Sequence, residues 1–78
     1  MGETISMTVE KQLGMRIRYL RTKKKLSQED LALMSGVNKN YLSNLERGSR
    51  NPTLKLLEKI CRGLDINLET LLKGIETF

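Results

Sequence analysis

The sequence lacks histidine altogether and contains a single cysteine, Cys61, among its 78 residues. Without histidine, no imidazole is available to act as a general base or to help activate a nucleophile. One thiol cannot form an intramolecular disulfide, and it cannot supply the three or four His and Cys ligands of a zinc site. We therefore expect a protein that is not an enzyme and that needs no metal or cofactor.

Long apolar segments are also missing. The longest uninterrupted apolar run, Leu31 to Met34, is far shorter than the roughly 20 residues that a membrane-spanning helix needs. The first 15 residues include Glu3 and Glu10 and no apolar core of signal-peptide length. We expect a cytoplasmic protein without a membrane partner. A chain of this length forms one small core, so residues 1–78 are expected to be a single domain, with its core at about 9–74 and a flexible N-terminus.

Basic residues outnumber acidic ones by 14 to 9, which gives a net charge of +5. The segment from Lys11 to Lys25 holds seven basic residues and no acidic one, so the excess lies in the first third of the chain. A basic surface favours an anionic partner, with nucleic acid the first candidate and a membrane surface the second. A basic stretch is also typical of a solvated helix face, so the neighbouring segments must decide.

The composition of the chain, together with the positions of its capping and helix-ending residues, predicts an all-α fold. There is one proline and there are three aromatic residues, while Leu, Lys and Glu, which favour helices, are frequent. Five helices are expected, the first at about 9–24, the third at about 39–47 and the last ending near Gly74. Gly36 and Gly48 are expected to end the second and third helices. The predicted N-caps are Thr8, Ser27, Asn38 and Thr53, and the fifth helix is expected to start after Asn67.

Two of these helices carry apolar stripes at helical spacing that predict the core. The stripe of the first helix is Val9, Leu13, Ile17 and Leu20. The stripe of the fourth helix is Leu54, Leu57, Ile60, Cys61 and Leu64. Because it lies within this stripe, Cys61 is interpreted as a small core residue.

The segment Gln28–Arg47 has the spacing of two helices that cross steeply. Such a pair needs a small residue where the helices approach, a residue that tolerates positive φ in the turn, and apolar anchors inside the second helix. These positions are held by Ala32, Gly36, Val37, Leu42 and Leu45. The pattern resembles the helix-turn-helix of the phage Cro and repressor superfamily, over about residues 9–74. The resemblance implies a compact five-helix lambda-repressor-like domain that binds double-stranded DNA.

Within that superfamily, residues 40–52 resemble most the controller proteins of restriction-modification systems. The resemblance implies a homodimer without a small-molecule ligand, which binds operators upstream of its own gene and the endonuclease gene. It implies activation at low occupancy and repression at higher occupancy, and activation needs RNA polymerase as a further partner. A phage-like repressor and an antitoxin that represses its own operon are the alternatives within the superfamily. An alternative of another class is an adaptor whose basic face binds an acidic protein.

The outward face of the third helix is expected to read bases, because the N-terminal residues of a recognition helix enter the major groove. Lys39 can donate to guanine, and Asn40 or Asn44 can bridge adenine N6 and N7. Ser43 is permissive, because a hydroxyl can donate to or accept from more than one base. Phosphate contact or plain solvation is the alternative for each. The predicted base-contacting residues are Lys39, Asn40, Ser43 and Asn44.

A second group of residues is expected to hold the DNA backbone. By resemblance, Gln28 corresponds to a phosphate-binding glutamine, although it can also be an ordinary first-turn residue. Tyr41 can reach a phosphate or pack in the core, Arg47 can cap helix carbonyls, and Asn51 can shape the turn. Arg16, Lys23, Lys24 and Lys25 are weaker phosphate candidates. The predicted backbone-contacting residues are Gln28, Tyr41, Arg47, Arg50 and Asn51.

Four other positions are given structural roles by the resemblance. Arg21 and Glu46 match a partly buried ion pair that joins the first and third helices in the superfamily. Such a pair fixes orientation more than it adds stability. Lys25 and Asp65 occupy positions where the superfamily usually has glycine, so each is expected to adopt a left-handed conformation at a cost of about 1 kcal/mol.

The C-terminal end has more apolar residues than the small core needs. One recognition helix covers only a few base pairs, so a two-fold dimer with its recognition helices about 34 Å apart is expected. An exposed apolar patch suits such an interface. Alternatively, Leu68 and Leu72 complete the monomer core. The predicted dimerisation segment contains Leu68, Leu72, Ile75 and Phe78.

Overall fold

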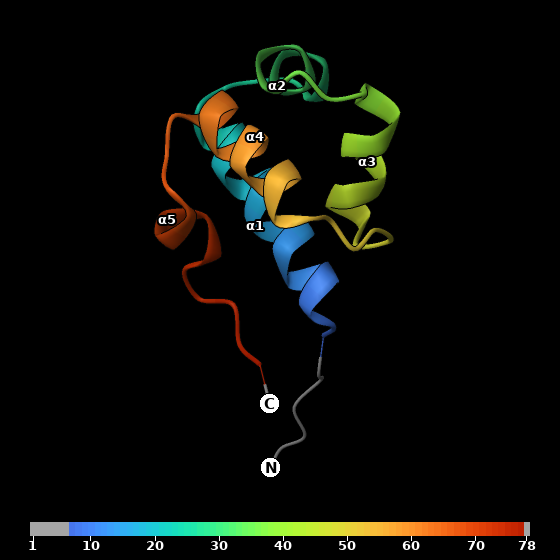
Figure 1. Cartoon of the computed structure of the whole chain (residues 1–78), viewed down its shortest axis with the longest axis vertical. Helices are drawn as coiled ribbons and strands as arrows, with labels where there is room; N and C mark the ends of the chain where they lie inside the picture. The colour runs from blue at the N-terminus through green and yellow to red at the C-terminus, as the bar shows by residue number, and fades with distance from the viewer. Residues whose placement is uncertain (1–6, 78) are drawn as a thin grey trace.

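The computed structural model describes residues 7–77 and contains five α-helices (Figure 1). Their bounds are α1 Val9–Lys23, α2 Gln28–Ser35, α3 Lys39–Arg47, α4 Leu54–Leu64 and α5 Leu68–Leu72. The all-α prediction is confirmed, and the helix bounds agree within about two residues. The expected flexible N-terminus falls largely on residues 1–6, which lie outside the described residues, as does Phe78. No helix between residues 7 and 77 has the length and hydropathy to cross a membrane.

Four helices begin at their predicted caps, and α5 begins directly after Asn67, as expected; the five N-caps are Thr8, Ser27, Asn38, Thr53 and Asn67. The side chains of these five residues each accept a backbone N–H from the first helical turn. Ser27 is part of a capping box, because the Asp30 carboxylate accepts the backbone N–H of Ser27 at 2.9 Å while the Ser27 hydroxyl accepts that of Asp30. This backbone hydrogen bond holds the pKa of Asp30 below its ordinary value.

The helix ends also follow the sequence. Gly36 and Gly48 end α2 and α3 with φ of 69° and 82°, in the left-handed region where glycine carries no Cβ penalty. Lys25 and Asp65 adopt φ of 61° and 58°, as expected for residues that stand in glycine positions. Both are therefore strained positions in the backbone.

Replacing Lys25 with glycine should raise the free energy of unfolding by about 1 kcal/mol, because glycine adopts φ of 61° without strain. Urea unfolding of the variant and the wild type measures this difference. Lys24→Gly is the matched control, because Lys24 has φ of −90° and nothing to relieve. A Lys25→Gly variant no more stable than the wild type would show that the strain is absent.

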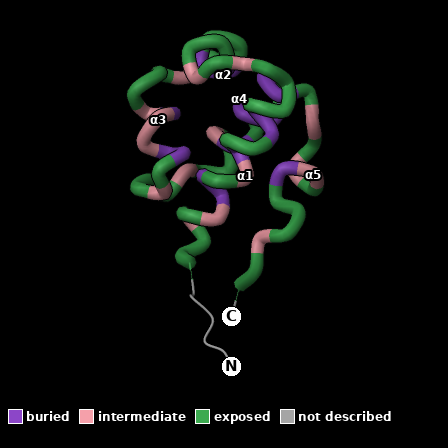
Figure 2. Tube along the Cα trace, turned by 180° about the vertical axis from the view of Figure 1, so that it is seen from behind, coloured by how far each residue is buried: buried purple, intermediate pink, exposed green. Residues whose placement is uncertain are grey.

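The helices pack in two pairs, α1 against α3 and α2 against α4, while α5 lies against α1 and α4. The buried segments of the trace turn toward the common interior in Figure 2. Both apolar stripes supply this core, with two exceptions at their ends. Val9 and Leu54 are 45% and 69% exposed. Their inclusion in the predicted core is wrong, because each lies in the first turn of its helix, where the neighbouring helices leave much of its side chain uncovered.

Two glycines allow the paired helices to approach closely. A Cβ on Gly14 of α1 would lie within 2.5 Å of the Leu45 and Glu46 carbonyl oxygens of α3. A Cβ on Gly63 of α4 would overlap the side chain of Ser35 in α2. These contacts fix α3 against α1 and α2 against α4. These close approaches were not predicted, because the sequence does not show which helix packs against a glycine inside another helix.

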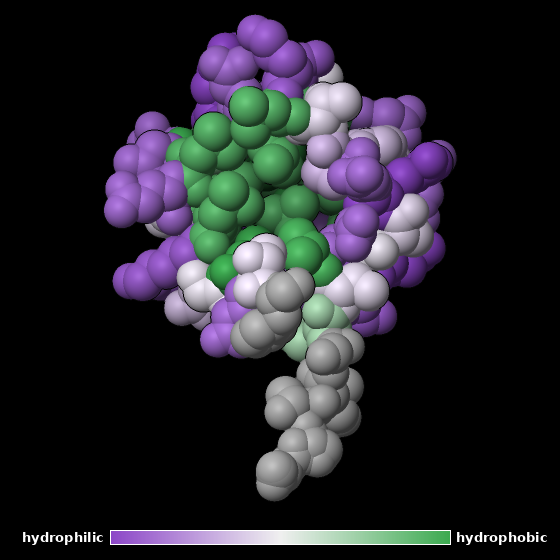
Figure 3. Space-filling view, turned by 60° about the horizontal axis from the view of Figure 1, so that its bottom comes forward, coloured by the Kyte–Doolittle hydropathy of each residue, from purple (hydrophilic) through white to green (hydrophobic). Residues whose placement is uncertain are grey.

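Apolar side chains also gather on the outer face that α4 and α5 present (Figure 3). A groove of about 370 Å³ runs along this face between the start of α1, the start of α4 and the chain after α5. We call residues 73–77 the C-terminal segment. Beside it lies a smaller hollow whose lining includes Leu54 and Leu68. The apolar residues that line the groove are Val9, Leu13, Leu57, Leu72 and Ile75. We refer to the groove together with Leu54 and Leu68 as the apolar face.

Candidate nucleic-acid interface

Helices α2 and α3 and the turn between them form a helix-turn-helix. The Val37 N–H donates to the Ala32 carbonyl at 3.0 Å and closes the turn after Gly36. Leu42 and Leu45 are fully buried and anchor α3 from inside. The opposite side of α3 is therefore left to solvent, and Lys39 and Asn40 are exposed at its N-terminal end. This is the part of such a helix that can enter the major groove.

A buried polar network fixes α3 to α1 and to the start of α2. Arg21 donates to both carboxylate oxygens of Glu46, at 2.7 and 3.0 Å, and to the Leu26 carbonyl at 2.8 Å. The two side chains are only 10% and 4% exposed. The predicted ion pair is thus present. Its fork geometry fixes orientation as well as distance.

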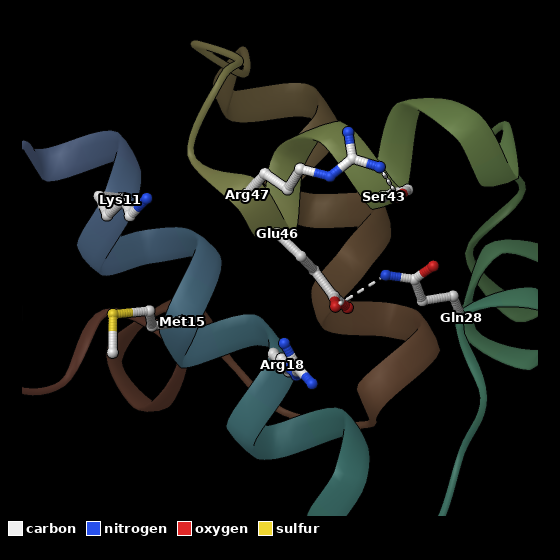
Figure 4. A pocket seen from close by; sticks show the side chains of 7 residues that line it. All are labelled: Lys11, Met15, Arg18, Gln28, Ser43, Glu46 and Arg47. Atoms are coloured by element: carbon white, nitrogen blue, oxygen red, sulfur yellow. Dashed lines mark hydrogen bonds between the residues drawn. The ribbon is translucent and has the colours of Figure 1, made fainter.

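Gln28 completes this network from the first turn of α2. Its Nε2 donates to Oε1 of Glu46 at 3.0 Å, so the amide is directed toward the protein (Figure 4). The amide nitrogen carries a second N–H beyond the one given to Glu46. Gln28 is therefore held in place rather than free, and Glu46 holds Arg21 and Gln28 together.

A hollow of about 440 Å³ lies between α1, the start of α2 and α3 (Figure 4). Lys11 and Arg18 line it from α1, and Arg47 lines it from α3. The Glu46 carboxylate at its floor is already paired with Arg21. Three cations thus surround a hollow whose one acid is neutralised, which makes it suited to an anion.

The residues of α3 beyond its first turn are tied to one another. Arg47 donates to Asn44 Oδ1 at 3.1 Å and to Ser43 Oγ at 3.2 Å. Ser43 and Asn44 are half-buried, whereas Arg47 is exposed. The guanidinium therefore lies along the outward side of α3, and the suggestion that it caps helix carbonyls is not what the structure shows.

The loop after α3 holds the remaining predicted backbone contacts. Tyr41 is half-buried against the core, and the Arg50 guanidinium lies 5.4 Å from the centre of its ring. Arg50 and Asn51 are exposed. The structure thus brings most of the predicted residues onto one side of the molecule, around α3 and its flanking loop.

One weaker candidate, Arg16, is engaged elsewhere. Its guanidinium donates to the Thr70 and Leu71 carbonyls at the end of α5, at 2.7 and 3.2 Å. It is therefore not available to a phosphate. Lys11 and Arg18 were not singled out from the sequence, although they share a face of α1 with Met15 at spacings of four and three. That spacing is the signal that could have found them.

The fold and this site define a helix-turn-helix domain of the DNA-binding class. The sequence profile of the helix-turn-helix family matches residues 17–71, which is more than half of the chain. The chain belongs to this family of XRE-like DNA-binding transcription regulators.

Among its curated relatives is the transcriptional regulator SinR of Bacillus subtilis, which is 43% identical over 61 residues. That match covers 77% of this chain but only 55% of SinR, so the chain spans about half of that relative's length. The structure is similar to the restriction-modification controller protein C.AhdI of Aeromonas hydrophila, with 44% identity, a TM-score of 0.76, and coverage of 81% and 94%. It is also similar to the controller C.Esp1396I, solved as a tetramer with its 35-base-pair operator. There the identity is 33%, the TM-score 0.81 and the coverage 90% and 92%.

Proposed function

We propose that this protein is the controller of a restriction-modification operon, which binds operators of double-stranded DNA and regulates its own gene and that of the endonuclease. The observation that carries this proposal is the exposed N-terminal end of α3, flanked by a cation-lined hollow on one side and by Arg50 on the other. The likeness to two solved controllers supports the choice within the family. Its place of action is then the cytoplasm, where the operator lies.

In this proposal the outward side chains of α3 read base edges. Lys39 donates to guanine, and Asn40 pairs with adenine, because these residues are exposed at the end of α3 that enters the groove. Ser43 and Asn44 form the second part of the reading surface. They reach bases once Arg47 releases them and turns toward a phosphate.

The backbone of the operator is held on either side of α3. Gln28 donates its second amide N–H to a phosphate while Glu46 keeps the first. Lys11 and Arg18 line the same hollow and add positive charge to it. Beyond α3, Tyr41, Arg50 and Asn51 hold the next phosphates.

We propose further that the protein acts as a homodimer through the apolar face. Operators that are two-fold symmetric are read by two-fold symmetric dimers, and a single module covers too few base pairs. Leu68 and Ile75 are half-buried and Leu72 is 39% exposed, so each leaves surface for a second copy. The tetrameric state of C.Esp1396I on its operator supports self-association in this family.

Arg50→Ala should weaken binding to all DNA sequences alike, because an exposed loop arginine contacts phosphate and not bases. The slope of log affinity against log salt concentration should fall in magnitude by about one. Affinity titrations at several salt concentrations measure both effects. Arg62→Ala, which removes an exposed arginine of α4, is the control. A selective change in base preference would assign Arg50 a base contact instead.

Identifying the operator distinguishes a restriction-modification controller from a phage-like repressor or an antitoxin. Footprinting of the DNA upstream of the gene, with transcript levels of the gene and its neighbours, should reveal protected sites that control an endonuclease gene. RNA polymerase is then a further partner during activation. Protection upstream of phage genes or of a toxin gene would instead favour a phage-like repressor or an antitoxin.

A further inference from the structure

The C-terminal segment is held against α1 by two polar side chains that belong to no part of the DNA-binding site. Gln12 binds the backbone of Glu76 in both directions. Its Nε2 donates to the Glu76 carbonyl at 3.0 Å, and its Oε1 accepts the Glu76 N–H at 2.8 Å. The same Nε2 donates to the Met7 carbonyl at 3.1 Å. The amide of Gln12 therefore binds both the described beginning and the described end of the chain, which lie at the same end of the molecule in Figure 1.

Arg16, one turn further along α1, holds the end of α5. It donates to the carbonyls of Thr70 and Leu71 in the last turn of α5, and the Thr70 carbonyl also accepts the Lys73 N–H at 3.4 Å. A cation at this end also interacts favourably with the helix dipole. Helix α5 has five residues, too few to be stable alone, and one fully buried side chain, Leu71. The arrangement of α5 thus depends on contacts made by other elements.

The segment that Gln12 and Arg16 hold is also one wall of the apolar face. Ile75 lines the apolar groove on one side, and on the other side it lines a separate hollow with Gln12 and Arg16. Leu72 and Thr77 line the groove as well. Residues 73–77 therefore form one wall of the groove. The hydrogen bonds that Gln12 and Arg16 make to Glu76 and to the end of α5 lie on the other side of this wall and fix its position.

We propose that Gln12 and Arg16 are positioning residues for self-association: they hold α5 and residues 73–77 in the arrangement that a second copy of the chain recognises. This inference rests on the proposed homodimer. Because residues 73–77 are already held in place in the monomer, they do not lose conformational freedom when two copies associate. This lowers the free-energy cost of association. Neither side chain itself lies on the groove, so their effect on the dimer is indirect.

The test compares Gln12→Glu and Arg16→Met with the wild type by sedimentation equilibrium and by amide hydrogen exchange. Gln12→Glu keeps the shape and an acceptor for the Glu76 N–H, but it cannot donate to the Glu76 carbonyl. The repulsion between the new carboxylate and this carbonyl should separate residues 73–77 from α1, and this exposes the Glu76 amide. Each variant should raise the dimer Kd by about tenfold or more. Protection of the Glu76 amide should fall in Gln12→Glu, and helix content measured by circular dichroism should stay near that of the wild type.

Lys23→Ala is the matched control for Arg16. Lys23 and Arg16 both lie 5.6 Å from the Tyr19 ring, but only Arg16 binds α5. The control should dimerise as the wild type does. Variants that dimerise with an unchanged Kd would overturn the positioning role. A wild-type protein that stays monomeric at all concentrations would instead refute the proposed homodimer, and loss of Glu76 protection in Gln12→Glu would still show that Gln12 holds the segment.

Discussion

Replacing Arg21 with methionine should lower the free energy of unfolding by about 3–5 kcal/mol. The substitution leaves the Glu46 carboxylate buried with Gln28 as its remaining partner, and it also removes the donor to the Leu26 carbonyl. Removing one partner of a buried pair costs more than the pair contributes, because an uncompensated charge remains. Since small domains have total stabilities of about 5–15 kcal/mol, the variant should be close to unfolding at room temperature.

Urea unfolding at neutral pH measures this loss, with Arg18→Met as the control because Arg18 is an exposed arginine on the same helix. The double variant Arg21→Met, Glu46→Leu should recover most of the stability, since it removes both charges. An Arg21→Met protein as stable as the wild type would show that the buried network of Arg21, Glu46 and Gln28 does not stabilise the fold.

The second large effect concerns recognition. Lys39→Ala and Asn40→Ala should each lose about 1–3 kcal/mol of discrimination between the operator and a site changed at the contacted base pair. Folding should be unaffected, because both side chains are exposed and the Asn38 cap binds only backbone N–H groups of this turn. Affinities for the operator and for singly substituted operators, measured at one salt concentration, give the discrimination.

Lys59→Ala, which removes an exposed lysine of α4, is the matched control for charge. It should leave the discrimination unchanged. If both Lys39→Ala and Asn40→Ala also discriminate as the wild type does, the reading face does not lie at the N-terminal end of α3.

The sequence predicted the helices well because their ends are set locally. A cap such as Ser27 acts within one turn, and a left-handed stop such as Gly36 acts within its own residue. The two errors in the core, Val9 and Leu54, occur in first turns. Periodicity gives the direction in which a side chain points, but whether another helix reaches that far depends on the packing.

The candidate site was predictable in part for the same reason. The spacing within the helix-turn-helix shows which side of α3 faces outward. The roles of Gln12 and Arg16 were not predictable, because their partners are backbone groups 54 to 64 residues further along the chain. A basic residue in a basic stretch gives no sign that it binds carbonyls of a distant helix.

The proposed homodimer should read a two-fold symmetric DNA sequence. Selection of bound sequences from a random duplex library, at a stated salt concentration, tests it most directly. We expect an enriched motif with two inverted half-sites about one helical turn, or about 34 Å, apart. If no motif is enriched and binding disappears at moderate salt, the protein does not read a DNA sequence, and the result favours an adaptor whose basic face binds an acidic protein.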